Sequence, residues 1–215
     1  MFASTARNVG IAMITATMTI TSAALALTAT IPVDTSWRAI GPVGDLTGQG
    51  INNAPSLAWE ASHVGWNTLT SFDDSDSAGW KNAVQVIHPN VPFTRYWVDG
   101  TETVGSSPAY FRKVFNIPGP LQSGTLDFNV DDDAKIYVNG TLVFDDSDGL
   151  VDDVSGLNIF AQLHTGVNLI AVKAHDQQGA QSIQGQLNIS YIPEPSTIVL
   201  VTVFGLWPLF RRRVR

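Results

Sequence analysis

The sequence predicts an all-β fold, a β-sandwich or a barrel. Three observations lead to this prediction. Apolar residues alternate with polar ones over short runs, Gly and Pro separate these runs, and outside the two ends no stretch keeps a helical period for long. Many short strands joined by turns are typical of sandwiches and barrels. A chain of 215 residues can hold one ordinary domain with a tail at each end.

The first predicted strands lie before residue 131. AVQVIH begins a strand at Ala83, and residues 109–118 (AYFRKVFNIP) form another, with Phe111 and Phe115 on one face. In GTLDFNV, residues 124–130, three apolar side chains alternate with three polar ones. Because successive side chains of a strand point to opposite faces, this strand should have one buried and one solvated face.

The later strands include a hairpin and a central strand. AKIYVNGTLVF, residues 134–144, alternates on both sides of Asn139-Gly140, a pair that suits a two-residue turn because both central positions need positive φ. NLIAVKAH, residues 168–175, is apolar on both faces at first, as a buried central strand would be. QLNISY, residues 186–191, alternates again.

The order of these segments resembles the galactose-binding-like jelly roll that is attached to glycoside hydrolases and other secreted bacterial proteins. The resemblance covers roughly residues 72–191 and implies a jelly-roll β-sandwich. The residues that carry it are Phe72-Asp73-Asp74 with Trp80, Tyr110-Phe111-Arg112, Asp131-Asp132 before Tyr137-Val138-Asn139-Gly140, and Gly166-Val167-Asn168 before Ile170-Ala171-Val172. The segment before Phe72 matches less clearly and is expected to supply the first strand or two.

The N-terminus has the pattern of a secretory signal peptide. Arg7 precedes a weakly apolar stretch from Val9 to Leu25, and Ala24-Leu25-Ala26 offers small residues at the two positions that signal peptidase reads. We therefore expect a signal peptide over residues 1–26, followed by a leader of the mature chain at 27–36 and by the β-sandwich domain at 37–192.

The C-terminus combines a short apolar run with a basic end. Residues 196–210 are almost entirely apolar, but 15 helical residues span only about 22 Å, less than the roughly 30 Å of a hydrocarbon core. The basic end should stay on the cytoplasmic side of the membrane. A plain tail anchor is the alternative to the sorting signal described next.

The motif Pro193-Glu194-Pro195, the apolar run and the basic end together resemble the PEP-CTERM sorting signal of Gram-negative bacteria, over residues 193–215. The matching residues outside the apolar run are Pro193, Glu194, Pro195, Arg211, Arg212 and Arg213. The resemblance implies processing by an exosortase-type enzyme after transient membrane insertion of the short C-terminal helix. It further implies export across the cytoplasmic membrane, membrane anchoring before processing, and a final place at the cell surface or in the extracellular matrix.

The charge of the middle of the chain argues against nucleic acid as a partner. Residues 27–192 hold 18 acidic and 7 basic residues, a difference of 11, so little would neutralise phosphates. The chain contains no cysteine, which excludes thiol chemistry. No catalytic motif stands out either, because the four histidines lack metal-ligand spacing and Gly-x-Ser-x-Gly is absent. We therefore do not expect an enzyme.

Acidic residues form two groups in the sequence. Asp131-Asp132-Asp133 ends a predicted strand and is expected to be structural, because Asp in turns bonds its own backbone. The second group follows the predicted hairpin and is a weak candidate for Ca²⁺, which takes six to eight oxygen ligands. It consists of Asp145, Asp146, Asp148, Asp152 and Asp153. Solvated turn acids are the alternative for this group.

Tryptophans are candidates for stacking on sugar rings, although they equally suit a sandwich core. Trp80 is expected in the core, whereas Trp97, in the polar context FTRYWVDG, is the candidate for an exposed ligand-binding position. The sequence thus predicts an exported, non-catalytic surface or matrix protein that contacts exopolysaccharide. The alternatives are a structural or calcium-stabilised protein-interaction module without a sugar site, and a hydrolase accessory domain without its enzyme.

Overall fold

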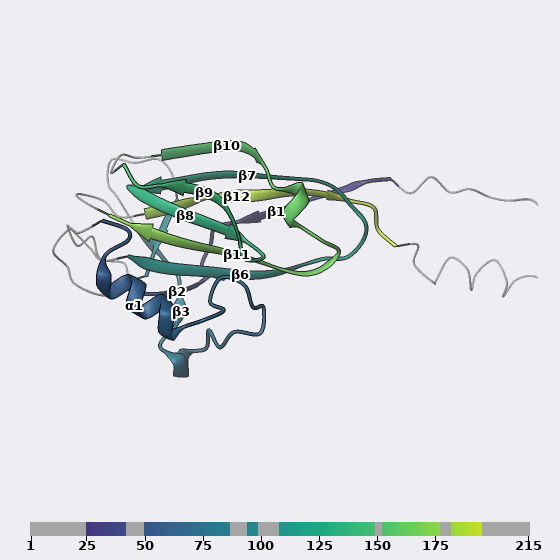
Figure 1. Ribbon diagram of the computed structural model, residues 1–215. Coiled ribbons are helices and arrows are strands. Elements are labelled where there is room, and N and C mark those ends of the chain that lie inside the picture. Colours follow the sequence, from purple (N-terminus) through teal and green to yellow (C-terminus); the bar gives the residue numbers. More distant parts are fainter. Residues whose placement is uncertain are drawn as a thin grey trace, which may run out of the picture.

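The protein is a β-sandwich of two antiparallel sheets, here called sheet A and sheet B, in the computed structural model (Figure 1). The structure describes residues 25–41, 50–86, 94–98, 108–148, 152–176 and 182–194. The predicted signal peptide and most of the predicted sorting signal lie outside these residues. Among the described residues, no helix is long and apolar enough to cross a membrane.

Each sheet contains six described strands, and every pairing between them is antiparallel. Sheet A has the order β10 (Asp152–Asn158), β7 (Leu121–Asp131), β12 (Ser182–Tyr191), β5 (Arg95–Trp97) and β4 (Val84–Val86), and β1 (Leu27–Pro32) also pairs with β12. Sheet B has the order β3 (Lys81–Asn82), β2 (Arg38–Ile40), β6 (Ala109–Ile117), β11 (Gly166–His175), β8 (Asp133–Val138) and β9 (Thr141–Asp146).

The main core lies between the two sheets and follows the predicted alternation. Leu126, Phe128 and Val130 of β7 point inward and are at most 3% exposed. In β11 all residues from Asn168 to His175 are buried, as expected for a central strand. The predicted turn is also confirmed, since Asn139 and Gly140 connect β8 to β9 with φ of 48° and 83°.

The predicted leader at residues 27–36 is wrong, because β1 belongs to sheet A. Its six residues pair with β12 from Leu27 opposite Tyr191 to Pro32 opposite Gln186. The strand alternates like its neighbours, and Ile31 packs against the core. As a result β1 begins and β12 ends at the same end of the sandwich, the right-hand end in Figure 1.

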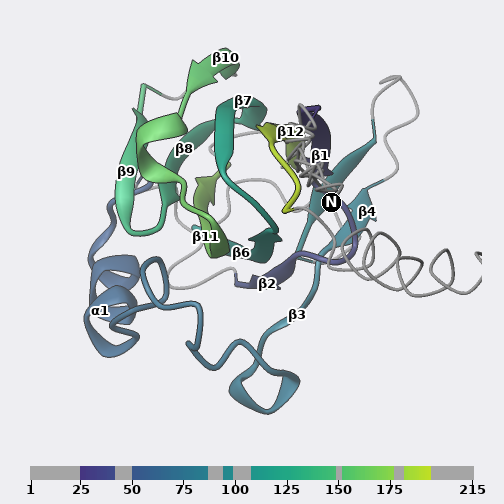
Figure 2. The same cartoon turned by 90° about the vertical axis from the view of Figure 1, so that its right-hand side faces the viewer.

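A helix, which the sequence analysis did not predict, covers part of sheet B. Helix α1 (Ala54–Ser62) is capped by Asn53, whose side chain accepts a hydrogen bond of 2.8 Å from the Ser56 backbone N–H at the helix N-terminus. Residues 50–80, with α1 and the short 3₁₀ helix η1 (Asp76–Ala78), form a third layer outside sheet B. Figure 2, which looks along the strands, shows α1 below sheet B and away from sheet A.

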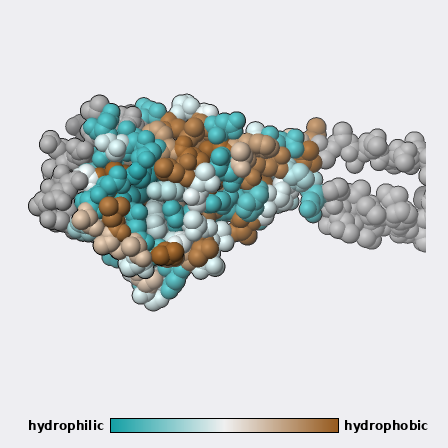
Figure 3. Space-filling view, viewed as in Figure 1, coloured by the Kyte–Doolittle hydropathy of each residue, from teal (hydrophilic) through white to brown (hydrophobic). Residues whose placement is uncertain are grey.

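The third layer has its own apolar cluster. Trp66 and Trp80 pack there with Tyr110, Leu169 and Ala171, which point outward from β6 and β11. Another 3₁₀ helix, η2 (Phe160–Gln162), connects β10 to β11. On the face shown in Figure 3, hydrophobic residues reach the surface among hydrophilic ones, which is ordinary for a folded domain.

Candidate functional site

The outer face of sheet A bears two hollows that follow one another along β7 and β12. The larger has a volume of about 600 Å³ and the smaller about 270 Å³. We call the outward-pointing polar side chains that line them the polar strip. It consists of Ser123, Thr125, Asp127 and Asn129 of β7; Gln184, Gln186, Asn188 and Ser190 of β12; Asp153 and Ser155 of β10; and Thr28 and Thr30 of β1.

The first part of the strip is a row of side chains that crosses three strands. Asn129 lies opposite Gln184 of β12 and opposite Asp153 of β10. Gln184 donates to Asn129 Oδ1 over 3.0 Å, and Asn129 Nδ2 donates to Asp153 Oδ1 over 2.6 Å. These bonds fix the orientation of both amides, while the side chains remain partly exposed to solvent. The row therefore presents ordered donors and acceptors to the hollow.

Asp127 organises the second part of the strip. A bulge in β10 separates Val154 from Leu157, and the Gly156 backbone N–H donates to Asp127 Oδ1 over 2.8 Å. Asn188 Nδ2 donates to the other carboxylate oxygen over 2.8 Å. Thr30 of β1 then donates to Asn188 Oδ1 over 3.2 Å. Asp127 thus connects the two hollows and holds the bulge, so its role is largely structural.

Gly185 brings the backbones of β12 and β7 close together beneath the larger hollow. Its φ is +147°, and a Cβ there would lie 2.4 Å from the Asp127 carbonyl oxygen and 2.7 Å from Phe128 Cδ2. Only glycine fits such a position. Phe128 also lines the hollow, but it belongs to the core and is 3% exposed. The described lining residues therefore offer no aromatic stacking surface and no Lys or Arg.

Sequence reasoning missed this site, although the signal was present. The alternation in GTLDFNV and QLNISY predicts a polar outer face as well as a buried one. On that face, the positions in residues 123–129 and 184–190 are all Ser, Thr, Asn, Gln or Asp. The pairing of β7 with β12 brings the two sets together, and this pairing could not be read from either segment alone.

Trp97 is wrong as an exposed ligand-binding candidate. It is 1% exposed and contacts Phe111 of the other sheet, with ring centroids 5.4 Å apart. The polar neighbours in the sequence do not decide its exposure, because successive strand residues point to opposite faces. Trp80, expected in the core, is 0% exposed.

The acids proposed as a calcium site are not brought together. Asp145 and Asp146 lie on β9 of sheet B, whereas Asp152 and Asp153 lie on β10 of sheet A. Both oxygens of Asp145 accept from Lys135 Nζ over 2.7 Å, and Asp148 lies beyond the end of β9. Nowhere in the described part of the chain do three or more His, Asp or Glu side chains gather as a metal ion would require.

The other acidic group is buried at one end of the sandwich. Asp131, Asp132 and Asp133 are 9%, 7% and 1% exposed. Asp131 pairs with Arg95 at 3.3 Å, and Asp133 lies 3.0 Å from Nδ1 of the buried His175. Burial, with Asp132 close by, raises the pKa of Asp131 to about 6. The contacts shown are side-chain pairs with Arg95 and His175, and the structural role of this group stays a prediction.

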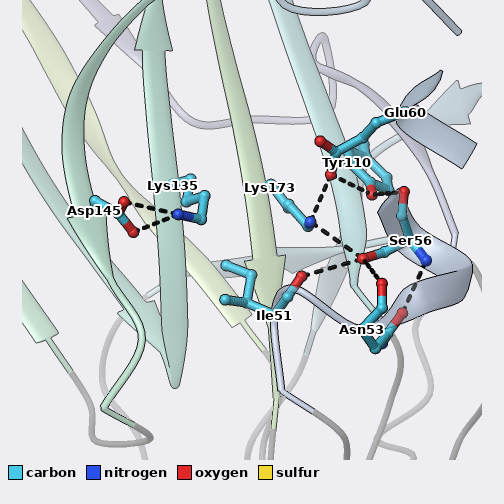
Figure 4. Close-up of polar contacts among 8 residues, drawn as sticks. All are labelled: Ile51, Asn53, Ser56, Glu60, Tyr110, Lys135, Asp145 and Lys173. Carbon is cyan, nitrogen blue, oxygen red and sulfur yellow. Dashed lines mark hydrogen bonds and ion pairs between the residues drawn. The ribbon is translucent and has the colours of Figure 1, made fainter. Parts of the chain in front are cut away.

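The outer face of sheet B holds a second polar cluster, shown in Figure 4. Lys173 of β11 is 1% exposed, and its Nζ donates to Glu60 Oε1 over 2.5 Å and to Ser56 Oγ over 3.2 Å. Tyr110 donates to the same Glu60 oxygen over 3.0 Å. Burial lowers the pKa of Lys173 and raises the pKa of Tyr110. Because Ser56 and Glu60 belong to α1, the cluster joins the third layer to sheet B, with the Lys173 side chain 1% exposed.

The predicted sorting motif begins where the fold ends. β12 ends at Tyr191, and the Ile192 backbone N–H donates to the Pro120 carbonyl over 2.9 Å. Pro193 and Glu194 follow directly and are described. Pro195 and the three arginines Arg211, Arg212 and Arg213 lie outside the described residues.

Comparisons with known proteins give only distant structural similarity. No protein-family model and no curated protein matches the chain. A β-glucuronidase from Bacteroides uniformis is 16% identical, with a TM-score of 0.40 over 76% of this chain and 18% of its own. A glycosyl hydrolase family 2 member from Bacteroides cellulosilyticus is 16% identical, with a TM-score of 0.42 over 75% and 20%.

An exo-chitosanase from Amycolatopsis orientalis is also similar, at 19% identity and a TM-score of 0.37 over 61% of this chain and 19% of its own. The chain thus spans about a fifth of the length of these solved structures. At such TM-scores, none of these similarities bears on the function of this chain.

Proposed function

We propose that this chain is an exported, non-catalytic surface or matrix protein that contacts polysaccharide through the polar strip. One observation carries the proposal. Seven of the ten described residues that line the larger hollow carry hydroxyl, amide or carboxylate groups, and hydrogen bonds fix the orientation of four of them, Asp127, Asn129, Asp153 and Gln184. Sugar hydroxyls both donate and accept hydrogen bonds, so a row of fixed amides and carboxylates complements them. Pre-ordered side chains also lose little entropy when a ligand binds.

The strip is open and shallow, which suits binding rather than catalysis. Its two carboxylates are engaged, Asp127 by the bulge of β10 and Asp153 by Asn129. Hydrolysis of a glycosidic bond usually needs an acid and a base placed around the bond, one with a raised pKa. We therefore regard the domain, in fold a galactose-binding-like jelly roll, as a binding module without enzymatic activity.

Binding can be tested with the purified full-length chain on an array of polysaccharides. The double variant Gln184→Ala with Gln186→Ala removes two amides of the strip. Gln85→Ala is the matched control, since it removes an exposed amide from β4 of the same sheet, outside both hollows. We expect the double variant to lose at least tenfold in affinity and the control to bind as the wild type. Absence of binding to every polysaccharide would refute the function.

Export and sorting form the second half of the proposal. They rest on the residues of the two ends: a signal peptide read by signal peptidase, and a PEP-CTERM signal read by an exosortase-type enzyme in the membrane of a Gram-negative bacterium. Deleting residues 193–215 should release the protein in soluble form from cells. Replacing only Pro193, Glu194 and Pro195 with alanine should leave the protein membrane-bound and unprocessed. A truncated form that still fractionates with membrane or matrix would contradict the sorting.

A further inference from the structure

We infer that the polar strip takes an extended segment of a polysaccharide whose sugars carry no acid groups, and that it rejects polyuronates and other acidic polymers. The inference rests on the proposed function and adds the charge class and the length of the ligand. It comes from the distribution of charge between the two sheets and from the dimensions of the strip.

Basic residues are almost confined to sheet B. Of the seven Lys and Arg residues in 27–192, the strands of sheet B hold six: Arg38, Lys81, Arg112, Lys113, Lys135 and Lys173. The strands of sheet A hold Arg95 alone, and Arg95 pairs with Asp131 at the end of the sheet. The same strands contain four acids, Asp127, Asp131, Asp152 and Asp153. Because Asp131 is buried against Arg95, the acids that remain on the described outer face of sheet A are Asp127 and Asp153, and both line the larger hollow.

The larger hollow is lined by two carboxylates, whose charge acts on any ligand there although both accept hydrogen bonds from neighbouring groups. Asp153 is exposed, and Asp127 is partly exposed between β10 and β12. An ionised carboxylate accepts hydrogen bonds only, so it matches a sugar hydroxyl but repels the carboxylate of a uronic acid. Among the described residues, the lining of both hollows contains no Lys or Arg to offset that repulsion. Amides and hydroxyls alone would not discriminate in this way.

The length of the strip favours a chain of sugars over a monosaccharide. From Gln184 to Ser190 the outward positions of β12 are six residue steps apart, about 20 Å at roughly 3.3 Å per step. The two hollows lie along this length, and Asp127 of the larger one accepts a hydrogen bond from Asn188 of the smaller one. A ligand that fills both must be an extended oligosaccharide segment lying along β12.

The experiment compares polymers that share a backbone and differ in charge. Full-length protein is titrated with dextran and carboxymethyl-dextran, and with hydroxyethyl-cellulose and carboxymethyl-cellulose, at low and at physiological salt. We expect each neutral polymer that binds to do so at least about tenfold more tightly than its carboxymethylated form, with the difference shrinking as salt screens the repulsion. Oligomers of increasing length should gain affinity until the strip is filled.

Two variants separate the local charge from the net charge. Asp153→Asn removes a charge inside the larger hollow and keeps the shape of the side chain. Asp76→Asn removes the same charge from η1 in the layer outside sheet B, where the side chain is 87% exposed. We expect Asp153→Asn to bind the carboxymethylated polymers several-fold more tightly, and Asp76→Asn to leave the ratio unchanged.

The outcomes distinguish this inference from the proposed function. If no polymer on the array binds, the proposed function fails and this inference with it. If a carboxymethylated polymer binds as tightly as its neutral form, or if both variants relax the ratio equally, the inference fails while polysaccharide binding stands. If affinity does not increase beyond a monosaccharide, the extended mode of binding is wrong.

Discussion

The outer face of sheet B is charged and covered, whereas the outer face of sheet A is polar and open. On sheet B four bases point outward, and each meets an acid: Lys135 with Asp145, Lys173 with Glu60, Arg112 with Asp74, and Arg38 with Asp76. Three of these acids belong to the covering layer of residues 50–80. Ion pairs therefore help to hold the third layer on the outer face of sheet B, whose inner face packs in the main core.

On sheet A the side chains satisfy one another across the strands. Asn129, Asp153 and Gln184 form one bonded row, and Thr30, Asn188 and Asp127 form another. Such rows need no cover, because each group keeps solvent access. The ion pairs on sheet B join it to the third layer, whereas the rows on sheet A stay at the surface, as the proposed binding of a polysaccharide requires.

The strongest test of this comparison is the buried guanidinium of Arg112. It pairs with Asp74 at 3.0 Å and donates to the Trp66 and Leu69 carbonyls, with its side chain fully buried. Arg112→Met leaves these acceptors without a partner, so we expect a loss of about 3–5 kcal/mol in the free energy of unfolding. Lys81→Met, which replaces an exposed base of the same sheet, should change it by less than about 0.5 kcal/mol. Urea unfolding measures both, and equal stabilities would show that Arg112 does not hold the layer.

A second prediction concerns Glu60, the partner of Lys173. Glu60→Gln leaves the Lys173 ammonium buried and uncompensated, so we expect a loss of about 2–3 kcal/mol near neutral pH. The Lys173 pKa is lowered in the fold by burial. Between that lowered value and the ordinary value of 10.5, the unfolded chain binds more protons, so this group makes stability rise with pH.

The pH dependence gives the control for Glu60. Lys173→Met removes the titrating group, so the rise in stability with pH should be smaller in Lys173→Met than in the wild type. In Glu60→Gln, where the ammonium has lost its counter-charge, the rise should begin at lower pH. Chemical unfolding between pH 7 and 10 measures all three proteins. If stability changed with pH in the same way in all three proteins, Lys173 would not be buried as a cation.

A smaller effect is expected at the turn between β8 and β9, which touches the covering layer. Gly140 has φ of +83°, and a Cβ there would lie 2.4 Å from Thr68 Cγ2. Gly140→Ala should therefore cost about 1–3 kcal/mol from backbone strain and the contact together. Thr68→Ser removes the methyl group, so the double variant should regain part of the loss. Gly156→Ala, where φ is +64° and no atom lies within 4 Å, measures the strain alone.

These features also show what the sequence could predict. Alternation located the inward faces of β6, β7, β8 and β12, because burial between two sheets imposes a period of two. The Asn139-Gly140 turn was predictable, since few residue pairs tolerate its φ values. Helix α1 was missed because it is one short element without a long apolar repeat. The pairing of Arg112 with Asp74 depends on how the covering layer folds back, which no local pattern encodes.

The same reasoning explains the fate of the candidate site residues. The polar neighbours of Trp97 in the sequence do not decide its exposure, because a strand residue is buried or exposed according to its face, and Trp97 faces the core. Asp145 and Asp153 are eight positions apart in the sequence, yet they belong to different sheets. Residues that are close in sequence can therefore lie on different sheets of a sandwich. The polar strip, in contrast, is formed by strands that are distant in sequence and adjacent in space.

The smallest expected change in stability is at the polar strip, and there it separates binding from folding. The amides of Gln184 and Gln186 contact the hollow and carry no core contact, so the double alanine variant should keep the free energy of unfolding within about 0.5 kcal/mol of the wild type. The contrast with Arg112 is the point of the measurement, because both faces are polar and only one is covered. If the sheet A variant unfolds as easily as Arg112→Met, the strip is a structural network and not a surface reserved for a ligand. If it keeps its stability and loses polysaccharide affinity while Gln85→Ala loses neither, the two faces have the separate roles assigned to them here.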